Sequence, residues 1–76
     1  MTTITSIEIS SDPIYLAFGA TSVDVYALAA RVRELCPDVD VRVLIGLGRA
    51  YRVVCDPDER GDLTTRVEQA YEEQWL

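Results

Sequence analysis

The sequence contains no histidine, no lysine and no asparagine, and its basic side chains are seven arginines. Without histidine there is no Ser–His or Cys–His nucleophile pair and no imidazole metal ligand. Without lysine there is no Schiff-base amine and no lysine for a phosphate-binding loop. These absences disfavour most enzyme chemistries, so we expect a protein that is not an enzyme and that uses no cofactor and no metal.

Cysteines and long apolar runs are also scarce. Cys36 and Cys55 lack C-x-x-C spacing and are too few for a disulfide framework, so we predict two buried, reduced thiols. No apolar run approaches the roughly 18 residues of a membrane span. Residues 1–11 lack the basic and hydrophobic regions of a secretory signal. Frequent Arg, Ala, Val and Asp indicate a GC-rich coding sequence of bacterial or phage origin, and we expect a cytoplasmic location in the bacterial host.

The negative charge is concentrated near the C-terminal end. The 76 residues, which predict one domain over 1–76, carry a net charge of −6. Residues 1–55 hold six acids and five arginines, a net of −1, whereas residues 56–76 hold seven acids and two arginines, a net of −5. Phosphate binding requires clustered basic side chains, so we expect no direct nucleic-acid partner. Opposite potentials steer association, so a protein with a basic surface is the better candidate.

The first half of the chain predicts strands followed by a helix. Residues 4–10 alternate between apolar and polar, which is typical of a half-buried strand. Residues 14–18 continue this period after a turn at Pro13, either as a second strand or as part of one bent strand. Apolar residues at spacings of three and four then predict an amphipathic helix over 22–35, capped by Thr21 or Ser22.

Residues 39–55 predict a β-hairpin. Two alternating stretches flank Gly46-Leu47-Gly48, and an odd-length loop there keeps the apolar side chains of both strands on one face. This arrangement places Arg42, Arg49 and Arg52 near one outer edge. The G-x-G lies between two strands rather than between a strand and a helix, so we interpret it as a turn and not as a dinucleotide-binding loop.

The last segment predicts a second amphipathic helix. Asp56, Pro57 and Glu59 are typical of a helix start, although Gly61 leaves Asp62 as the alternative start of the main helix. An apolar stripe follows, with acids away from it. The predicted fold class is therefore α+β, with the order ββαββα (or βαββα) and an antiparallel sheet packed against two amphipathic helices.

The acidic side of this helix is the main candidate for a partner-binding site. A solvated face carries the same charges, so solubility is the alternative explanation. Tyr71 and Trp75 are candidates either for the core or for interface anchors, because buried aromatic residues often dominate interfaces. The predicted partner-binding residues are Asp56, Asp58, Glu59, Asp62, Glu68, Glu72, Glu73, Tyr71 and Trp75.

One short segment resembles acyl and peptidyl carrier proteins. The residues from Phe18 to Asp24 (FGATSVD) are similar to the motif around the serine that takes phosphopantetheine, with Thr21 where that family has an acid. The resemblance implies that Ser22 is a modification site and that the fold is all-helical. The strand pattern before this segment disagrees with that fold, so we interpret Ser22 as a helix cap.

A second resemblance is to the small anti-CRISPR proteins of phages and mobile elements. It rests on Met1, Thr2 and Thr3 followed by Thr5, Ser6 and Ile7, and on the small size and acidity of the chain. It implies a non-enzymatic inhibitor that binds a CRISPR effector subunit, and no functional residue carries over. We therefore hypothesise a protein-binding inhibitor that docks its acidic helix on a basic, nucleic-acid-binding surface of a CRISPR effector or similar host defence protein. A carrier-like protein and a homo-oligomeric (for example homodimeric) structural or regulatory module are the alternatives.

Overall fold

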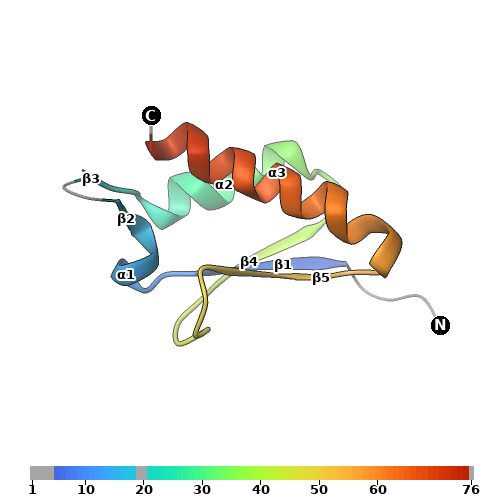
Figure 1. The fold of residues 1–76 in the computed structure, drawn as a ribbon, viewed down its shortest axis with the longest axis horizontal. Coiled ribbons are helices and arrows are strands. Elements are labelled where there is room, and N and C mark those ends of the chain that lie inside the picture. Colours follow the sequence, from blue (N-terminus) through green and yellow to red (C-terminus); the bar gives the residue numbers. More distant parts are fainter. Residues whose placement is uncertain (1–4, 19–20, 76) are drawn as a thin grey trace.

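The computed structural model describes residues 5–18 and 21–75 of the chain (Figure 1). It has three principal strands, two long helices and a small peripheral ribbon. The elements are β1 (Ser6–Ser10), α1 (Pro13–Leu16), β2 (Ala17–Phe18), β3 (Thr21–Ser22), α2 (Val25–Leu35), β4 (Asp40–Leu44), β5 (Tyr51–Val54) and α3 (Pro57–Trp75).

The principal sheet has β1 at its centre, in the order β4-β1-β5. Ile7 and Ile9 of β1 are fully buried, because α2 and α3 cover the face of the sheet toward which they point (Figure 1). The fold is α+β, with a sheet packed against two amphipathic helices, as the sequence predicts. The prediction of an antiparallel sheet is wrong, because β1 runs parallel to β4 and antiparallel to β5. A parallel pair needs a crossover connection, and α2 supplies it.

The predicted hairpin over 39–55 is wrong, because β1 lies between its two strands. Backbone N–H groups at the end of β1 donate to both sides, from Ser10 to the Ala50 carbonyl at 2.9 Å and from Ser11 to the Leu44 carbonyl at 2.9 Å. The connection over 45–50 must therefore span two strand spacings, about 10 Å. It is a crossing loop rather than an odd-length hairpin turn. Gly46 and Gly48 have φ of 74° and 78°, a conformation that only glycine adopts readily.

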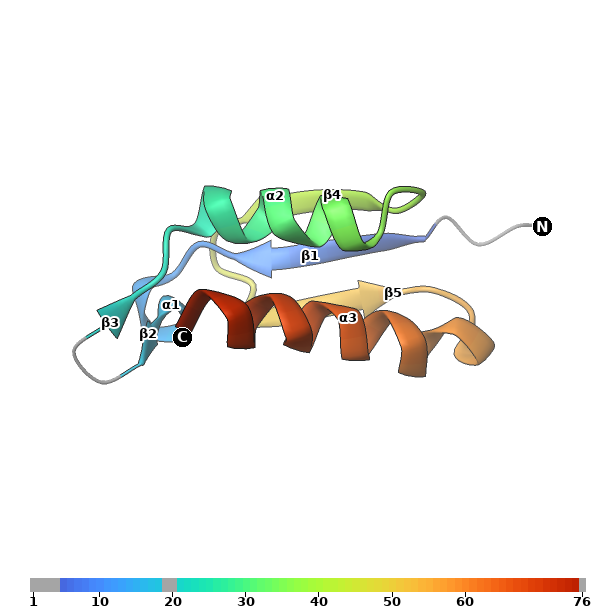
Figure 2. The ribbon, with the colours of Figure 1, turned by 90° about the horizontal axis from the view of Figure 1, so that it is seen from above.

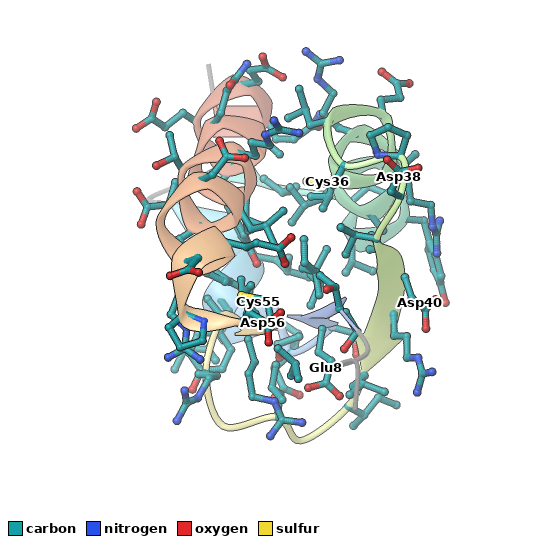
Figure 3. All side chains as sticks on the ribbon, turned by 90° about the vertical axis from the view of Figure 1, so that its right-hand side faces the viewer. Glu8, Cys36, Asp38, Asp40, Cys55 and Asp56 are labelled. Atoms are coloured by element: carbon teal, nitrogen blue, oxygen red, sulfur yellow. The ribbon has the colours of Figure 1, made fainter. Side chains whose placement is uncertain are left out.

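The arginines of the strands do not gather at one outer edge, contrary to the prediction. Arg42 and Arg52 lie opposite Glu8 on its two sides, at register positions in β4 and β5. All three belong to the face of the sheet that no helix covers, and Figure 3 shows Glu8 on this side. Arg52 forms an ion pair with Glu8, and Arg42 forms one with Asp40 at 2.7 Å. The charges of this open face therefore largely neutralise one another.

The segment after β1 also differs from the prediction. Residues 14–18 do not form a second strand paired with the first, because Pro13 begins the short helix α1 and only Ala17–Phe18 is a strand. The backbone of β2 pairs with β3, which contains Ser22. The cap of α2 is Asp24, whose carboxylate accepts a hydrogen bond from the Tyr26 N–H at 2.9 Å, rather than Thr21 or Ser22. The principal elements thus follow the order βαββα, with α1 and the β2–β3 ribbon inserted before α2.

The helices confirm the predicted apolar stripes. The buried residues of α2 are Val25, Leu28, Ala29 and Val32, and those of α3 include Leu63, Val67, Ala70 and Tyr71.

The structure decides between the two predicted starts of α3. The helix begins at Pro57 and continues through Gly61, so a start at Asp62 is wrong. Glycine in a helix interior costs about 1 kcal/mol relative to alanine.

The two cysteines are buried, and the helices are too short or too polar to cross a membrane within the described residues. Cys36 and Cys55 are both free and buried, as predicted, and Figure 3 shows Cys36 between the two helices. Within residues 5–18 and 21–75, no helix has the length and apolar character that crossing a membrane requires.

Candidate functional site

The seven acids of the C-terminal segment all have exposed side chains. Those on α3 lie outside the buried apolar stripe of the helix. Asp56 immediately precedes α3, and the other six lie within it. We call this set the acidic face: Asp56, Asp58, Glu59, Asp62, Glu68, Glu72 and Glu73.

Two acids of this face are already paired with arginines of the same chain. Glu73 forms a bidentate contact with Arg31 of α2, with Nε–Oε2 at 2.6 Å and Nη2–Oε1 at 3.2 Å. Hydrogen bonds from Arg31 and then from Gln69 lower the pKa of Glu73 below its usual range. Asp62 pairs with Arg66 at 3.2 Å. Glu73 therefore links α3 to α2, and the charge of Arg31 largely compensates its own. The sequence alone did not reveal this ion pair.

The other five acids have no cationic partner among the described residues. Glu68 accepts a hydrogen bond from the Tyr51 hydroxyl at 3.1 Å. Asp58 and Glu59 lie in the first turn of α3, where their charge complements the positive end of the helix dipole. Glu72 lies in the last third of the helix and is exposed. The structure thus divides the predicted site into a paired part and an unpaired part.

Of the two aromatic residues in the predicted site, Tyr71 is a core residue. It is 5 % exposed, and its hydroxyl donates to the Ala50 carbonyl at 3.0 Å. Its ring lies 5.7 Å from that of Tyr51, with the planes tilted by 37°. The side chain of Trp75 lies outside the described part of the chain.

A groove lies where α3 passes β5, and sequence reasoning missed it. It has a volume of about 270 Å³ and is lined by Ala50, Tyr51, Glu68, Tyr71 and Glu72. The tyrosine rings give it apolar walls, and two carboxylates stand at its rim. The spacing of four residues between Glu68 and Glu72 is the sequence signal for two acids on one side of a helix. Nothing in the sequence alone placed Tyr51 beside them.

The alkaline titration of Tyr71 depends on the burial of its side chain. Burial, and then the nearby Tyr51, raise the pKa of Tyr71 to about 12. An unfolded tyrosine ionises near pH 10, so between pH 10 and 12 the unfolded chain releases a proton that the folded chain keeps. The contribution of Tyr71 to stability is therefore complete below pH 10 and declines as the pH rises toward 12.

We expect the free energy of unfolding, measured with urea, to fall less steeply between pH 10 and 12 in Tyr71→Phe than in the native protein. Tyr26→Phe is the control, because Tyr26 is 74 % exposed. Equal slopes for the native protein and Tyr71→Phe would contradict the burial of this hydroxyl.

A second hollow lies at the other end of α3. It has a volume of about 210 Å³ and contains the buried Cys36 among Asp38, Glu59, Asp62 and Arg66. Burial raises the pKa of Cys36, and this effect outweighs the opposing influence of Arg66. A thiol with a raised pKa is protonated at neutral pH and is a poor nucleophile. Across residues 5–18 and 21–75, no three His, Cys, Asp or Glu side chains are placed to hold a metal ion.

Comparisons with protein-family models, with curated proteins and with solved structures found no match for this chain. The protein is therefore described by its own fold and surface, as a small α+β domain with a mixed sheet and an acidic helix face. This fold differs from the all-helical fold that the carrier resemblance implies. The backbone of Ser22 belongs to β3 and not to a helix start, and its side chain lies outside the described residues.

Proposed function

We propose that the protein is a non-enzymatic binding protein that docks the acidic face of α3 on a basic surface of another protein. The observation that supports this most strongly is the set of exposed carboxylates on one helix that have no cationic partner among the described residues. On the open face of the sheet, by contrast, Glu8 pairs with Arg52 and Asp40 with Arg42. Five of the eight acids that form no ion pair with a described residue lie on α3 or directly before it.

The chemistry of the partner follows from this charge. Exposed carboxylates complement arginine and lysine side chains, and surfaces that bind nucleic acid are rich in both. A protein bound to such a surface excludes the phosphate backbone. The similarity of the first residues to anti-CRISPR proteins gives the specific form of the proposal, in which the partner is a subunit of a CRISPR effector or a similar host defence protein.

The test compares three forms of the protein as bait for affinity capture from a bacterial lysate. The face variant carries Asp58→Asn, Glu59→Gln, Glu68→Gln and Glu72→Gln. The control variant removes four acids elsewhere, by Asp12→Asn, Glu34→Gln, Asp38→Asn and Asp40→Asn. Each variant loses four negative charges, which changes the net charge from −6 to −2. We expect the native protein and the control variant to retain a partner that the face variant loses. Retention of the same proteins by all three would contradict the proposal.

A further inference from the structure

The groove between β5 and α3 combines apolar walls with acidic ends. The rings of Tyr51 and Tyr71 form the walls, and among the described residues of the lining only Glu68 and Glu72 are charged. The Tyr51 hydroxyl donates to Glu68, and the Tyr71 hydroxyl donates to Ala50, so both rings are held in place. Such a site suits a side chain with an apolar stem and a cationic end, because the stem packs on the rings and the cation meets the carboxylates.

The strand beside this groove has an edge with which no other described strand pairs. Within residues 5–18 and 21–75, β5 pairs with β1 alone, and the bond from the Ser10 N–H to the Ala50 carbonyl fixes which residues face β1. Because antiparallel pairing alternates, Arg52 and Val54 direct their backbone groups toward β1, whereas Tyr51 and Val53 direct theirs outward. No hydrogen bond to the outward groups is found among the described residues. An extended segment can therefore add to this edge by backbone hydrogen bonds.

The two edges of the sheet are not equivalent. At the β4 edge, Arg33 of α2 donates to the Val41 carbonyl at 3.1 Å, so a side chain already occupies part of it. At the β5 edge, Figure 2 shows α3 running along the outer side of the strand. A segment added there would lie along the same side of the molecule as Glu68 and Glu72. Its side chains directed toward the helix layer would then enter the groove.

We propose that the groove and the β5 edge bind an extended segment of the partner that carries arginine or lysine, with the basic side chain lying between Tyr51, Tyr71, Glu68 and Glu72. This inference rests on the proposed function and names the element that the acidic face recognises. A second copy of this chain fits less well. Pairing of two β5 edges would bring Glu68 and Glu72 of both copies together, and like charges at close range repel.

The probe is a fluorescein-labelled peptide with blocked ends that alternates arginine and threonine. Binding is measured by fluorescence anisotropy at low salt. In a first matched peptide, citrulline replaces arginine, which removes the charge and keeps the shape. In a second, alternate backbone nitrogens are methylated, which prevents strand addition and keeps the arginines. We expect the native protein to bind the arginine peptide and to bind each matched peptide at least about tenfold more weakly.

Two variants locate the site. Glu68→Gln with Glu72→Gln removes the charges of the groove rim, and Asp12→Asn with Asp38→Asn removes the same number of charges outside the acidic face. We expect the first pair to weaken binding of the arginine peptide about tenfold and the second pair by less than about twofold. Equal losses for the two pairs would overturn the groove as the binding site, because they would show general charge attraction.

Two further outcomes would also overturn the proposal. Unchanged binding of the methylated peptide would eliminate strand addition. A native dimer in sedimentation velocity that tightens on Glu68→Gln with Glu72→Gln would assign the edge to a second copy. The proposed function is tested separately. If the Glu68→Gln, Glu72→Gln variant binds the peptide normally while the face variant still loses its captured partner, the groove is not the binding site. The acidic face is then still supported as the docking surface.

Discussion

Replacement of Ile9 by alanine is expected to destabilise the protein by about 3–4 kcal/mol. Ile9 is fully buried on the central strand, where it faces the layer of α2 and α3, and deletion of a buried isoleucine side chain leaves a cavity as well as lost apolar contacts. A chain of 76 residues has a free energy of unfolding of about 4–11 kcal/mol. The variant should therefore lose much of its stability, which urea denaturation followed by circular dichroism will measure.

Ile14→Ala is the matched control for this effect. Ile14 lies on α1 and is 77 % exposed, so the same substitution there should change the free energy of unfolding by less than about 0.5 kcal/mol. A loss below about 1 kcal/mol for Ile9→Ala, or equal losses for the two variants, would contradict the central position of β1.

The second large effect concerns partner binding by the face variant. Neutralisation of Asp58, Glu59, Glu68 and Glu72 should weaken affinity for the captured partner roughly thirtyfold, at about 0.5 kcal/mol for each charge. These four side chains are exposed and form no ion pair with another described residue, so their neutralisation should leave the fold intact. Biolayer interferometry at low salt measures the affinity, and circular dichroism confirms the fold.

The control variant separates position from total charge. It has the same net charge of −2 as the face variant, but its four substitutions lie outside α3. Its affinity should stay within about threefold of the native value, because distant exposed charges are screened by salt. If both variants lose affinity equally, total charge rather than the face of α3 governs binding.

Much of the local structure could be predicted from the sequence, because it depends on neighbouring residues. Alternation of Ile7 and Ile9 with polar residues identified β1, and spacings of three and four identified the buried faces of α2 and α3. The pair Asp56-Pro57 marked the start of α3 correctly. These patterns state which side of an element is buried but not which element covers it.

The strand order could not be predicted in the same way. Residues 39–55 show two alternating stretches with a glycine-rich connection, which is equally compatible with a hairpin and with strands separated by β1. The choice depends on the crossover through α2, which places β4 beside β1 and leaves the other side of β1 for β5. Such long-range pairing leaves no periodic signal within the stretch itself.

The charges of the candidate site could be predicted from the sequence, but the ion pairs and hydrogen bonds of its side chains could not. Composition located the acids on the last helix, and the structure confirms that they are exposed. It does not follow from the sequence that Arg31, 42 residues away, holds Glu73, or that Tyr51 contacts Glu68. The groove depends on both the strand order and the placement of α3 beside β5, so it could only be found in three dimensions.

Competition between this protein and DNA for the captured partner tests whether the acidic face occupies a nucleic-acid-binding surface. A fluorescein-labelled DNA duplex is first bound to the purified partner, and the native protein or the face variant is then added while anisotropy is recorded. If the acidic face occupies a basic, nucleic-acid-binding surface, the native protein will release the DNA and the face variant will do so only at much higher concentration. A stable complex of the partner with both the DNA and the native protein would contradict the account.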